Sequence, residues 1–550
     1  MKFSRRLFLQ LISAHVLNAR DYRCDVAIIG GGVGGCAAAL AACRNGMRVI
    51  MTEETDWIGG QLTSQAVPPD EHPWIESFGC TALYRAYRNR VRDYYRTHLP
   101  LTADVRGREL FNPGGGSVSR LTHEPRVSLA VLEEMLSPWI GGGQLTVLLE
   151  HKPIHAEFTG DRVRTVTVQS LRSGSPRTVT ASYFLDATEQ GDVLPLAKVE
   201  YVTGSESRKQ TGEAHAPEVA QPANLQAFTV CFAIDHRNGE NHVIDKPEEY
   251  AFWRDYVPKL KPAWPGKLLS WSMTHPVTLQ PRKVSFNPEP PYTSPADVLN
   301  LWLYRRIAAR DQFTPGSYRS DISLVNWPQN DYWLGNLHGV PEKEAALHLK
   351  RGRQLSLSLL YWMQTEAPRV DGGQGFPGLR IRPDQTGTED GLAKYPYIRE
   401  SRRIEAEFTV FEQHVAFDQG SQQVVAQNLS DSVGTGSYRI DLHPSSGGDN
   451  YIDISSLPFQ IPLGSLIPKR VENLIPACKN LGVTHITNGC YRLHPVEWNI
   501  GESAGALAAQ AVKTRQIPRA IRNDRKLFAE FRTLIEEQGI ETQWPKLSPR

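Results

Sequence analysis

The stretch Asp25–Gly60, DVAIIGGGVGGCAAALAACRNGMRVIMTEETDWIGG, decides the fold. Val26–Ile29 is an apolar run of strand length, and glycines follow it in the spacing G-x-G-x-x-G. An alanine-rich run of helix length comes next and ends at Asn45-Gly46, a pair that favours a helix C-terminus. A second apolar run, Met47–Thr52, follows. This order of strand, glycine turn, helix and strand predicts a parallel βαβ unit that binds a dinucleotide.

Each glycine of the motif has a physical role in such a unit. Gly30 makes the tight turn, Gly32 lets a pyrophosphate approach the backbone, and Gly35 lets the helix pack closely on the strand. The helix N-terminus carries partial positive charge, which favours the phosphates. Glu53 follows the second strand, where it accepts hydrogen bonds from a ribose and disfavours the 2′-phosphate of NADP. The alternative is a glycine-rich loop that binds no ligand. Such a loop gives no reason for a strand before it, a helix after it and an acid at the end of the next strand.

The residues beyond this unit distinguish FAD from NAD. Glu54–Gln61 carries a glycine pair that resembles the E-x(4–5)-G-G extension of FAD-dependent oxidoreductases in the glutathione-reductase-like structural group. Tyr183–Asp192, YFLDATEQGD, resembles the second signature of that group, although Glu189 stands where the group usually has glycine. The resemblance implies FAD contacts from Gly59, Gly60, Gln61, Asp186, Gly191 and Asp192.

The C-terminal part of the chain resembles the return of that group to its nucleotide domain. The match lies in Asn473–Gly482, NLIPACKNLG, and in Gly501–Ala511, GESAGALAAQA. The resemblance implies a helix that begins at Gly501 and points its N-terminus at the flavin pyrimidine, where it stabilises negative charge. It adds Gly482, Gly501 and Glu502 to the expected cofactor contacts. The alternative is a capped terminal helix that only packs on the sheet.

From these signatures the chain is identified as a member of the FAD-dependent oxidoreductases, whose relatives include the flavin subunit of heterodisulfide reductase. The resemblance covers residues 24–200 and 455–515. It implies an α/β fold with a Rossmann-like FAD domain in discontinuous segments and an α+β substrate domain. We expect the FAD domain at 22–61, 118–200 and 455–520, an insertion at 62–117, the substrate domain at 201–454 and a tail at 521–550.

Composition excludes several other classes of protein. The 550 residues carry a net charge of +2, which gives no reason to expect a nucleic-acid partner. No apolar run reaches the roughly 18 residues that a membrane span needs. The seven cysteines include no C-x-x-C pair, which argues against a disulfide framework, an iron–sulfur module or a zinc ribbon. We therefore predict no metal site, and the heterodisulfide reductase activity does not carry over.

The first 20 residues resemble a targeting segment. Ser4–Leu9, SRRLFL, is similar to a twin-arginine export signal, which carries proteins already folded around a cofactor. The apolar region that follows, Leu7–Leu17, is short and contains Gln10 and His15. We expect export to the periplasm; the alternative is a basic N-terminal helix on a cytoplasmic protein.

Three segments of the middle of the chain predict local structure. Glu342–Glu366 predicts a helix with a buried face that includes Leu347 and Leu355. The glycine-rich Arg369–Arg399 predicts a wall or lid over a pocket. Arg399–Arg403, RESRR, predicts the start of a helix that is either a solvated charged face or, from the family resemblance, a segment near the flavin.

Histidines are the candidate bases. Oxidation of an alcohol or amine sends a hydride to flavin N5 while a base takes the heteroatom proton, and neutral histidine suits that role near pH 7. The candidates are His494, His485 and His443, in the order of their nearness in sequence to the expected Gly501 helix. Arg492 is a candidate clamp for a carboxylate or the flavin O2, and Tyr491 a candidate donor to a developing oxyanion. A structural role is the alternative for each.

The sequence therefore predicts a flavin-dependent oxidase or dehydrogenase that acts on a small organic substrate and passes electrons to an unidentified acceptor. Three alternatives stay open: an NAD-linked dehydrogenase, a flavin monooxygenase, and a flavin-bearing electron-transfer subunit without catalysis of its own. The W-x-W-x-I-P signature of flavin-dependent halogenases is absent from the sequence.

Overall fold

The computed structural model describes residues 21–295, 297–417 and 423–547. The segment that resembles a twin-arginine signal, residues 1–20, lies outside the described residues. In the described ranges, no helix combines the length and the apolar character needed to cross a bilayer.

The βαβ unit predicted from the glycine motif is present and lies in a seven-stranded sheet of order β3-β2-β1-β6-β5-β4, in which β21 also pairs with β6. The pairs β3–β2, β2–β1, β1–β6 and β6–β21 are parallel, whereas β4–β5 and β5–β6 are antiparallel. The predicted α/β class is confirmed. The strands are β1 (Tyr22–Ile29), β2 (Val49–Glu53), β3 (Leu145–Leu149), β4 (His151–Thr159), β5 (Arg162–Ser170), β6 (Pro176–Asp186) and β21 (Leu474–Pro476).

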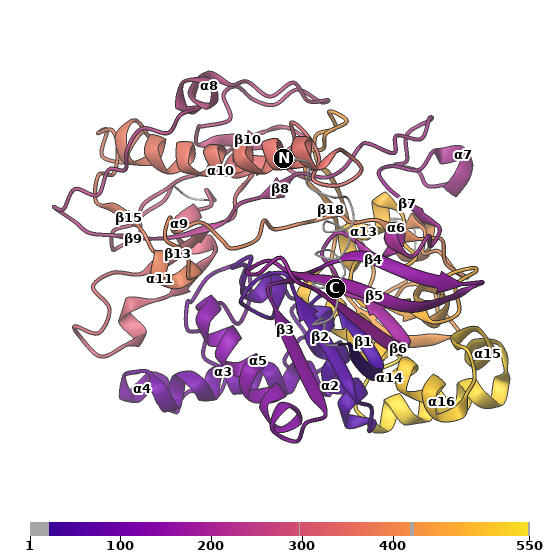
Figure 1. Cartoon of the computed structure of the whole chain (residues 1–550). Coiled ribbons are helices and arrows are strands. Elements are labelled where there is room, and N and C mark those ends of the chain that lie inside the picture. Colours follow the sequence, from indigo (N-terminus) through magenta and orange to yellow (C-terminus); the bar gives the residue numbers. More distant parts are fainter. Residues whose placement is uncertain (1–20, 296, 418–422, 548–550) are drawn as a thin grey trace, which may run out of the picture.

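Two helices from opposite ends of the chain pack together beside this sheet. Helix α2 (Val33–Arg44) follows the glycine loop, and α14 (His494–Thr514) comes near the C-terminus. Figure 1 draws them side by side, α2 in indigo and α14 in yellow. A Cβ atom added to Gly501 would lie 2.0 Å from the carbonyl oxygen of Gly34, and one added to Gly34 would lie 1.8 Å from that of Ala477. Only glycine permits this approach of the two backbones.

The predicted helix start at Gly501 is wrong. Helix α14 begins at His494, roughly two turns earlier. Pro495 stands in its first turn, where a missing N–H leaves no hydrogen bond unmade. Gly501 lies inside the helix, because a small residue is needed there for contact with α2.

The middle of the chain forms a second, four-stranded sheet of order β12-β13-β9-β15, with α10 (Glu342–Thr365) packed near it (Figure 1). The strands are β9 (Phe232–His236), β12 (Arg306–Ala308), β13 (Ile322–Val325) and β15 (Leu379–Ile381). Helix α10 confirms the prediction for Glu342–Glu366. Leu355 is buried as expected, but Leu347 is 54% exposed, because the buried face of α10 begins only at Gly352.

The remaining elements are mostly short. The helices are α3 (Ala82–His98), α4 (Ala103–Gly107), α5 (Pro125–Gly141), α6 (Val193–Leu196), α7 (Arg208–Thr211), α8 (Tyr250–Asp255), α9 (Leu301–Tyr304), α11 (Pro383–Thr386), α12 (Glu412–Val415), α13 (His485–Tyr491), α15 (Pro518–Asn523) and α16 (Arg525–Glu537). The strands are β7 (Tyr201–Val202), β8 (Phe228–Thr229), β10 (Ser272–Thr274), β11 (Pro281–Lys283), β14 (Asp331–Tyr332), β16 (Arg403–Ile404), β17 (Ser432–Gly436), β18 (Ile440–Leu442), β19 (Ile452–Ile454) and β20 (Phe459–Pro462).

The helix predicted to begin at Arg399 is also wrong. The residues before Arg403 have no regular structure, and Arg403 begins the short strand β16, which pairs with β7. The run is not a solvated face, since Arg399, Glu400 and Arg403 are all buried. Buried charges need partners. Glu400 accepts from Arg403 at 2.5 Å and Arg399 pairs with Asp331 at 2.9 Å, so the backbone here follows its ion pairs.

Gly501→Ala is expected to lower the free energy of unfolding by about 1–3 kcal/mol, because the added methyl group overlaps the backbone of α2. Gly141→Ala is the matched control: Gly141 ends α5, and nothing lies within 4 Å of a Cβ added there. The control is expected to be neutral or to stabilise by up to ~1 kcal/mol. Urea unfolding measures both variants, and an unchanged stability for Gly501→Ala would contradict the contact.

Candidate cofactor and active site

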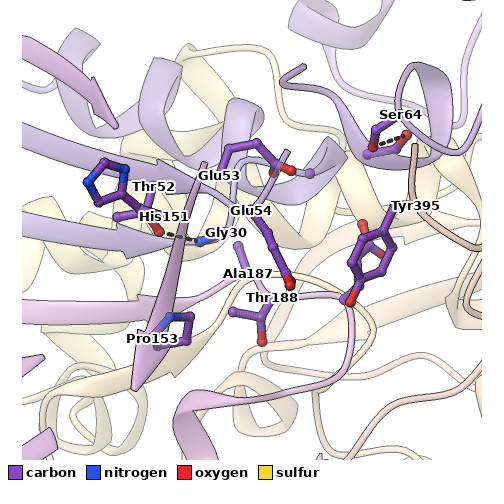
Figure 2. A pocket seen from close by; sticks show the side chains of 13 residues that line it. Gly30, Thr52, Glu53, Glu54, Ser64, His151, Pro153, Ala187, Thr188 and Tyr395 are labelled. Carbon is purple, nitrogen blue, oxygen red and sulfur yellow. Dashed lines mark hydrogen bonds between the residues drawn. The ribbon is translucent and has the colours of Figure 1, made fainter. Parts of the chain in front are cut away.

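A narrow cavity lies at the carboxyl ends of β1, β2 and β6. Ligands of open parallel sheets bind at this edge. Figure 2 shows Gly30 and Ala187 in the middle of the lining, with Thr52, Glu53 and Tyr395 around them. The wall formed by Tyr395 comes from the glycine-rich segment predicted as a wall or lid.

The glycine loop has the geometry that a pyrophosphate needs. Gly30 has a φ of +106°, and a Cβ atom there would lie 2.2 Å from the carbonyl oxygen of Ala187. A Cβ atom on Gly35 would lie 2.1 Å from the oxygen of Gly30. Gly32 precedes α2 and lines the cavity, so its missing side chain leaves the helix N-terminus open to an anion.

Glu53 lies next to this loop at the end of β2. Its Oε2 accepts from the backbone N–H of Gly31 at 3.1 Å, and its Oε1 accepts from that of Thr55 at 2.8 Å. Burial raises the pKa of Glu53 to about 7, although the hydrogen bonds from Thr55 oppose this. The carboxyl group therefore stands where the ribose of a dinucleotide bound on the loop would meet it.

Glu189, the departure from the usual signature, brings a carboxylate to the same loop. A Cβ atom on Gly32 would lie 2.9 Å from its Oε1, and this buried oxygen has no partner among the described residues. Its other oxygen is 2.5 Å from Nζ of the fully buried Lys479, which is also 3.4 Å from Glu497. Burial lowers the pKa of Lys479, but the two glutamates outweigh that effect and raise it. Lys479 is thus a permanent cation close to the loop.

These residues fit FAD at the pyrophosphate and ribose. Gly30 and Gly32 would hold the phosphates and Glu53 the ribose, whereas the charge of Lys479 is already offset by Glu189 and Glu497. Bound there, FAD would supply a two-electron acceptor.

Gly59, Gly60 and Gln61 also lie at the loop. The N–H of Gly59 donates to Gly31 at 2.7 Å, and Gly60 lines the cavity. Gln61 extends away from the cavity: its Nε2 donates to Glu497 at 2.7 Å and to the carbonyl oxygen of Arg492 at 3.0 Å. Gln61 therefore links the cofactor loop to the start of α14.

The acids of the second signature lie around the turn after β6. Asp186 accepts from the backbone N–H groups of Thr188 and Val193, so it holds the turn. Gly191 has a φ of +65° in the same turn. Asp192 lines a larger, open cleft that adjoins the cavity, and it pairs with Arg402 at 3.0 Å.

The three C-terminal cofactor candidates do not line the cavity. Gly482 packs against the backbone of Phe408, where a Cβ atom would lie 2.6 Å from the carbonyl oxygen. Gly501 contacts α2, as described above. Glu502 pairs at 3.0 Å with Arg44, at the opposite end of α2 from the glycine loop.

His443 lies between two carboxylates near Arg492. Its Nδ1 is 2.5 Å from Asp331, and its Nε2 is 3.6 Å from Asp441. Arg399 pairs with Asp331 at 2.9 Å, and Arg492 pairs with Asp441 at 3.2 Å. Since Arg492 is bound by Gln61, a short chain of contacts joins the cofactor loop to His443.

The two aspartates are ionised. Burial raises the pKa of each, but for Asp331 the charges of Arg399 and His443, and for Asp441 those of His443 and Arg492, outweigh burial and lower it. An ionised Asp331 can accept a hydrogen bond from Nδ1 of His443, 2.5 Å away, when that nitrogen carries a proton.

The other predicted catalytic side chains are held by hydrogen bonds or an ion pair within the protein. Nδ1 of the fully buried His494 accepts from the N–H of Asp70 at 3.1 Å, and burial lowers its pKa to about 3. Burial also lowers the pKa of His485, but Glu400, 2.9 Å away, outweighs burial and raises it. Tyr491 donates its hydroxyl to the backbone of Gln460 at 2.6 Å. Of the predicted catalytic residues, the structure thus joins only His443 and Arg492.

Two residues of this cluster, Asp331 and Asp441, were missing from the sequence prediction, which had named Arg399 only as the start of a segment that is either a solvated charged face or near the flavin. Asp441 lies on β18 two residues before His443, and this spacing places both on one face of an extended strand. That signal was available in the sequence. The pairing of Asp331 with His443 was not, because it joins segments 112 residues apart.

Gly32→Val is expected to abolish FAD binding, because the side chain occupies the space of the pyrophosphate. The backbone tolerates valine, since φ of Gly32 is −66° and the nearest atom is the flexible end of Glu189. Flavin absorbance of the purified, folded variant measures occupancy, and full occupancy would contradict the assignment. Glu53→Ala should weaken binding less, by about 1–3 kcal/mol.

The chain is similar to parts of solved structures and matches a family model. Solved structures similar to parts of the chain include the glycerol-3-phosphate dehydrogenase from Bacillus halodurans complexed with FAD, at 13% identity over 41% of this chain and 42% of that one, with a TM-score of 0.24. L-proline dehydrogenase from P. horikoshii matches at 17% identity over 34% and 24%, with a TM-score of 0.17. The flavin-dependent monooxygenase PieE, in complex with FAD and substrate, matches at 17% identity over 40% and 36%, with a TM-score of 0.23.

The chain thus spans less than half the length of each of these structures. No curated protein matches it. The model of the family described as FAD dependent oxidoreductase matches residues 25–535, which include both the glycine loop and α14. The chain therefore belongs to the FAD dependent oxidoreductase family.

Proposed function

We propose that this oxidoreductase is an oxidase or dehydrogenase in which His443 takes a proton from a small organic substrate as the substrate gives up a hydride. The observation that carries the proposal is the position of His443 between Asp331 and Asp441, joined through Arg492 to the cofactor loop. A general base has to be oriented and has to have its new charge stabilised.

Each neighbour of His443 has one part in that task. Asp331 keeps the proton on Nδ1, so that Nε2 presents its lone pair. Asp441 stabilises the imidazolium that forms when Nε2 takes the proton. Arg399 and Arg492 hold the two carboxylates in place, which fixes the imidazole between them.

The surroundings limit the access of water. Tyr397 and Tyr451 are 3% and 4% exposed, and the side chain of His443 is 17% exposed. Such a buried site strengthens the electrostatic interactions within it. An electron-transfer subunit without substrate chemistry has no need of a base held in this way, and this favours the oxidase or dehydrogenase.

His443→Gln is expected to keep FAD and to slow flavin reduction by about 10²–10⁴, the usual worth of a positioned general base. The measurement is anaerobic stopped-flow reduction by the compound that reduces the wild-type flavin fastest, chosen from sugars, polyols, amino acids, amines and phenols. A His443→Gln protein that is reduced at the wild-type rate would reject the assignment.

His494→Ala and His485→Ala are the matched controls for this measurement. His494 accepts a buried hydrogen bond from Asp70 and His485 pairs with the buried Glu400, so the loss of either side chain should lower thermal stability. A fall in the reduction rate of His494→Ala as large as that of His443→Gln, in a stable protein with FAD bound, would move the base to His494.

A further inference from the structure

Four buried hydrogen-bond donors near His443 have no partner among the residues that the structure describes. They are Nε of Arg399, Nε of Arg492, Nε2 of Gln226 and the hydroxyl of Tyr451. Buried polar groups in proteins are almost always paired. Four unpaired donors in one cluster therefore point to a ligand that supplies acceptors.

The four donors belong to one place because each residue is a neighbour of His443 or of its carboxylates. The N–H of His443 donates to Oε1 of Gln226 at 3.3 Å, and the ring of Tyr451 lies 5.5 Å from the imidazole. Arg399 and Arg492 reach the imidazole through Asp331 and Asp441. Both arginines also contact Tyr397. Cζ of Arg399 lies 5.1 Å from the centre of the Tyr397 ring, and Arg492 donates to the Tyr397 hydroxyl at 3.2 Å.

The charges of the cluster are already matched inside the protein. Arg399 pairs with Asp331 and Arg492 with Asp441, as described above. A third arginine nearby, Arg305, pairs with Asp70 at 3.2 Å. No arginine of this set is left over to bind a carboxylate, and no carboxylate to bind an ammonium. A charged substrate would lose its hydration here without a free counter-charge.

We propose that the substrate is an uncharged polyhydroxylated compound, a sugar or a polyol, whose hydroxyl oxygens accept from these four donors. This inference rests on the proposed role of His443. One carbinol of the substrate would lose its C–H as a hydride to bound FAD and its O–H proton to Nε2 of His443. The C–O bond becomes C=O, and two electrons pass to the FAD.

Matched compounds test the substrate class directly. The holoenzyme is titrated anaerobically with D-glucose, D-galactose, D-xylose, D-sorbitol and myo-inositol, and with the charged analogues gluconate, galacturonate and glucosamine, while perturbation of the flavin spectrum and heat of binding are recorded. At least one uncharged compound is expected to bind at least tenfold more tightly than its charged analogue. Tighter binding of a charged analogue, or no binding by any uncharged compound, would overturn the proposal.

Tyr451→Phe tests the donor set in the protein. The hydroxyl that it removes has no partner among the described residues, so affinity for the bound sugar should fall about tenfold while the melting temperature stays the same or rises. Tyr250→Phe is the matched control, because its hydroxyl donates to Glu366 at 2.7 Å, so it should lower stability and leave sugar binding unchanged. Wild-type sugar affinity in Tyr451→Phe would reject the donor set.

The two proposals fail in different ways. If a charged compound reduces the flavin and this reduction depends on His443, the substrate class is wrong and the role of the base stands. If a sugar binds in a manner that depends on Tyr451, but His443→Gln is reduced at the wild-type rate, the base is wrong and the substrate class stands.

Discussion

The close approach of α2 and α14 is the constraint on which the rest of the site depends. Gly34 and Gly501 let the two helix backbones touch, and Gly34 also lies against Ala477 at the end of β21. This contact brings the amino end of α14 beside the glycine loop, although the two segments lie at opposite ends of the chain. Gln61 then reaches from the loop to Arg492, and Arg492 reaches Asp441 beside His443. The cofactor loop and the candidate base His443 are therefore both positioned by the packed pair of helices α2 and α14.

Paired buried charges position the side chains of the candidate site. Asp331 and Asp441 are ionised because arginines and His443 offset the cost of burying them. Such pairs add little net stability, but removal of one partner leaves an uncompensated charge, so the geometry is strongly held. Arg399 and Arg492 are paired with these aspartates, so neither arginine is free to pair with an acidic ligand. The proposed orientation of the base and the proposed selection against charged substrates thus have one physical origin.

The nucleotide-binding part of the fold could be predicted from local sequence because its signals are local. The spacing of the glycines, the apolar strands and the acid after β2 all lie within Asp25–Gly60. Gly501 was wrongly predicted to begin a helix because glycine is common both at helix ends and where two helices approach closely. Only the position of α2 in the structure shows that the second reason applies here. The start of a helix at Arg399 failed for a related reason: the charges of that run are bound by Asp331 and Glu206, which come from other segments. Nearness in sequence to α14 placed His443 last among the histidines, whereas the structure joins it to Arg492 through Asp441.

The position of the flavin ring in a crystal structure of the protein with bound FAD tests the central claim most directly. The account predicts that the pyrophosphate lies on Gly30 and Gly32, that the ring meets the amino end of α14 beside Arg492, and that Nε2 of His443 opens onto the space at the ring. A ring that instead turns into the cleft lined by His338 and Arg402, away from His443, would contradict it.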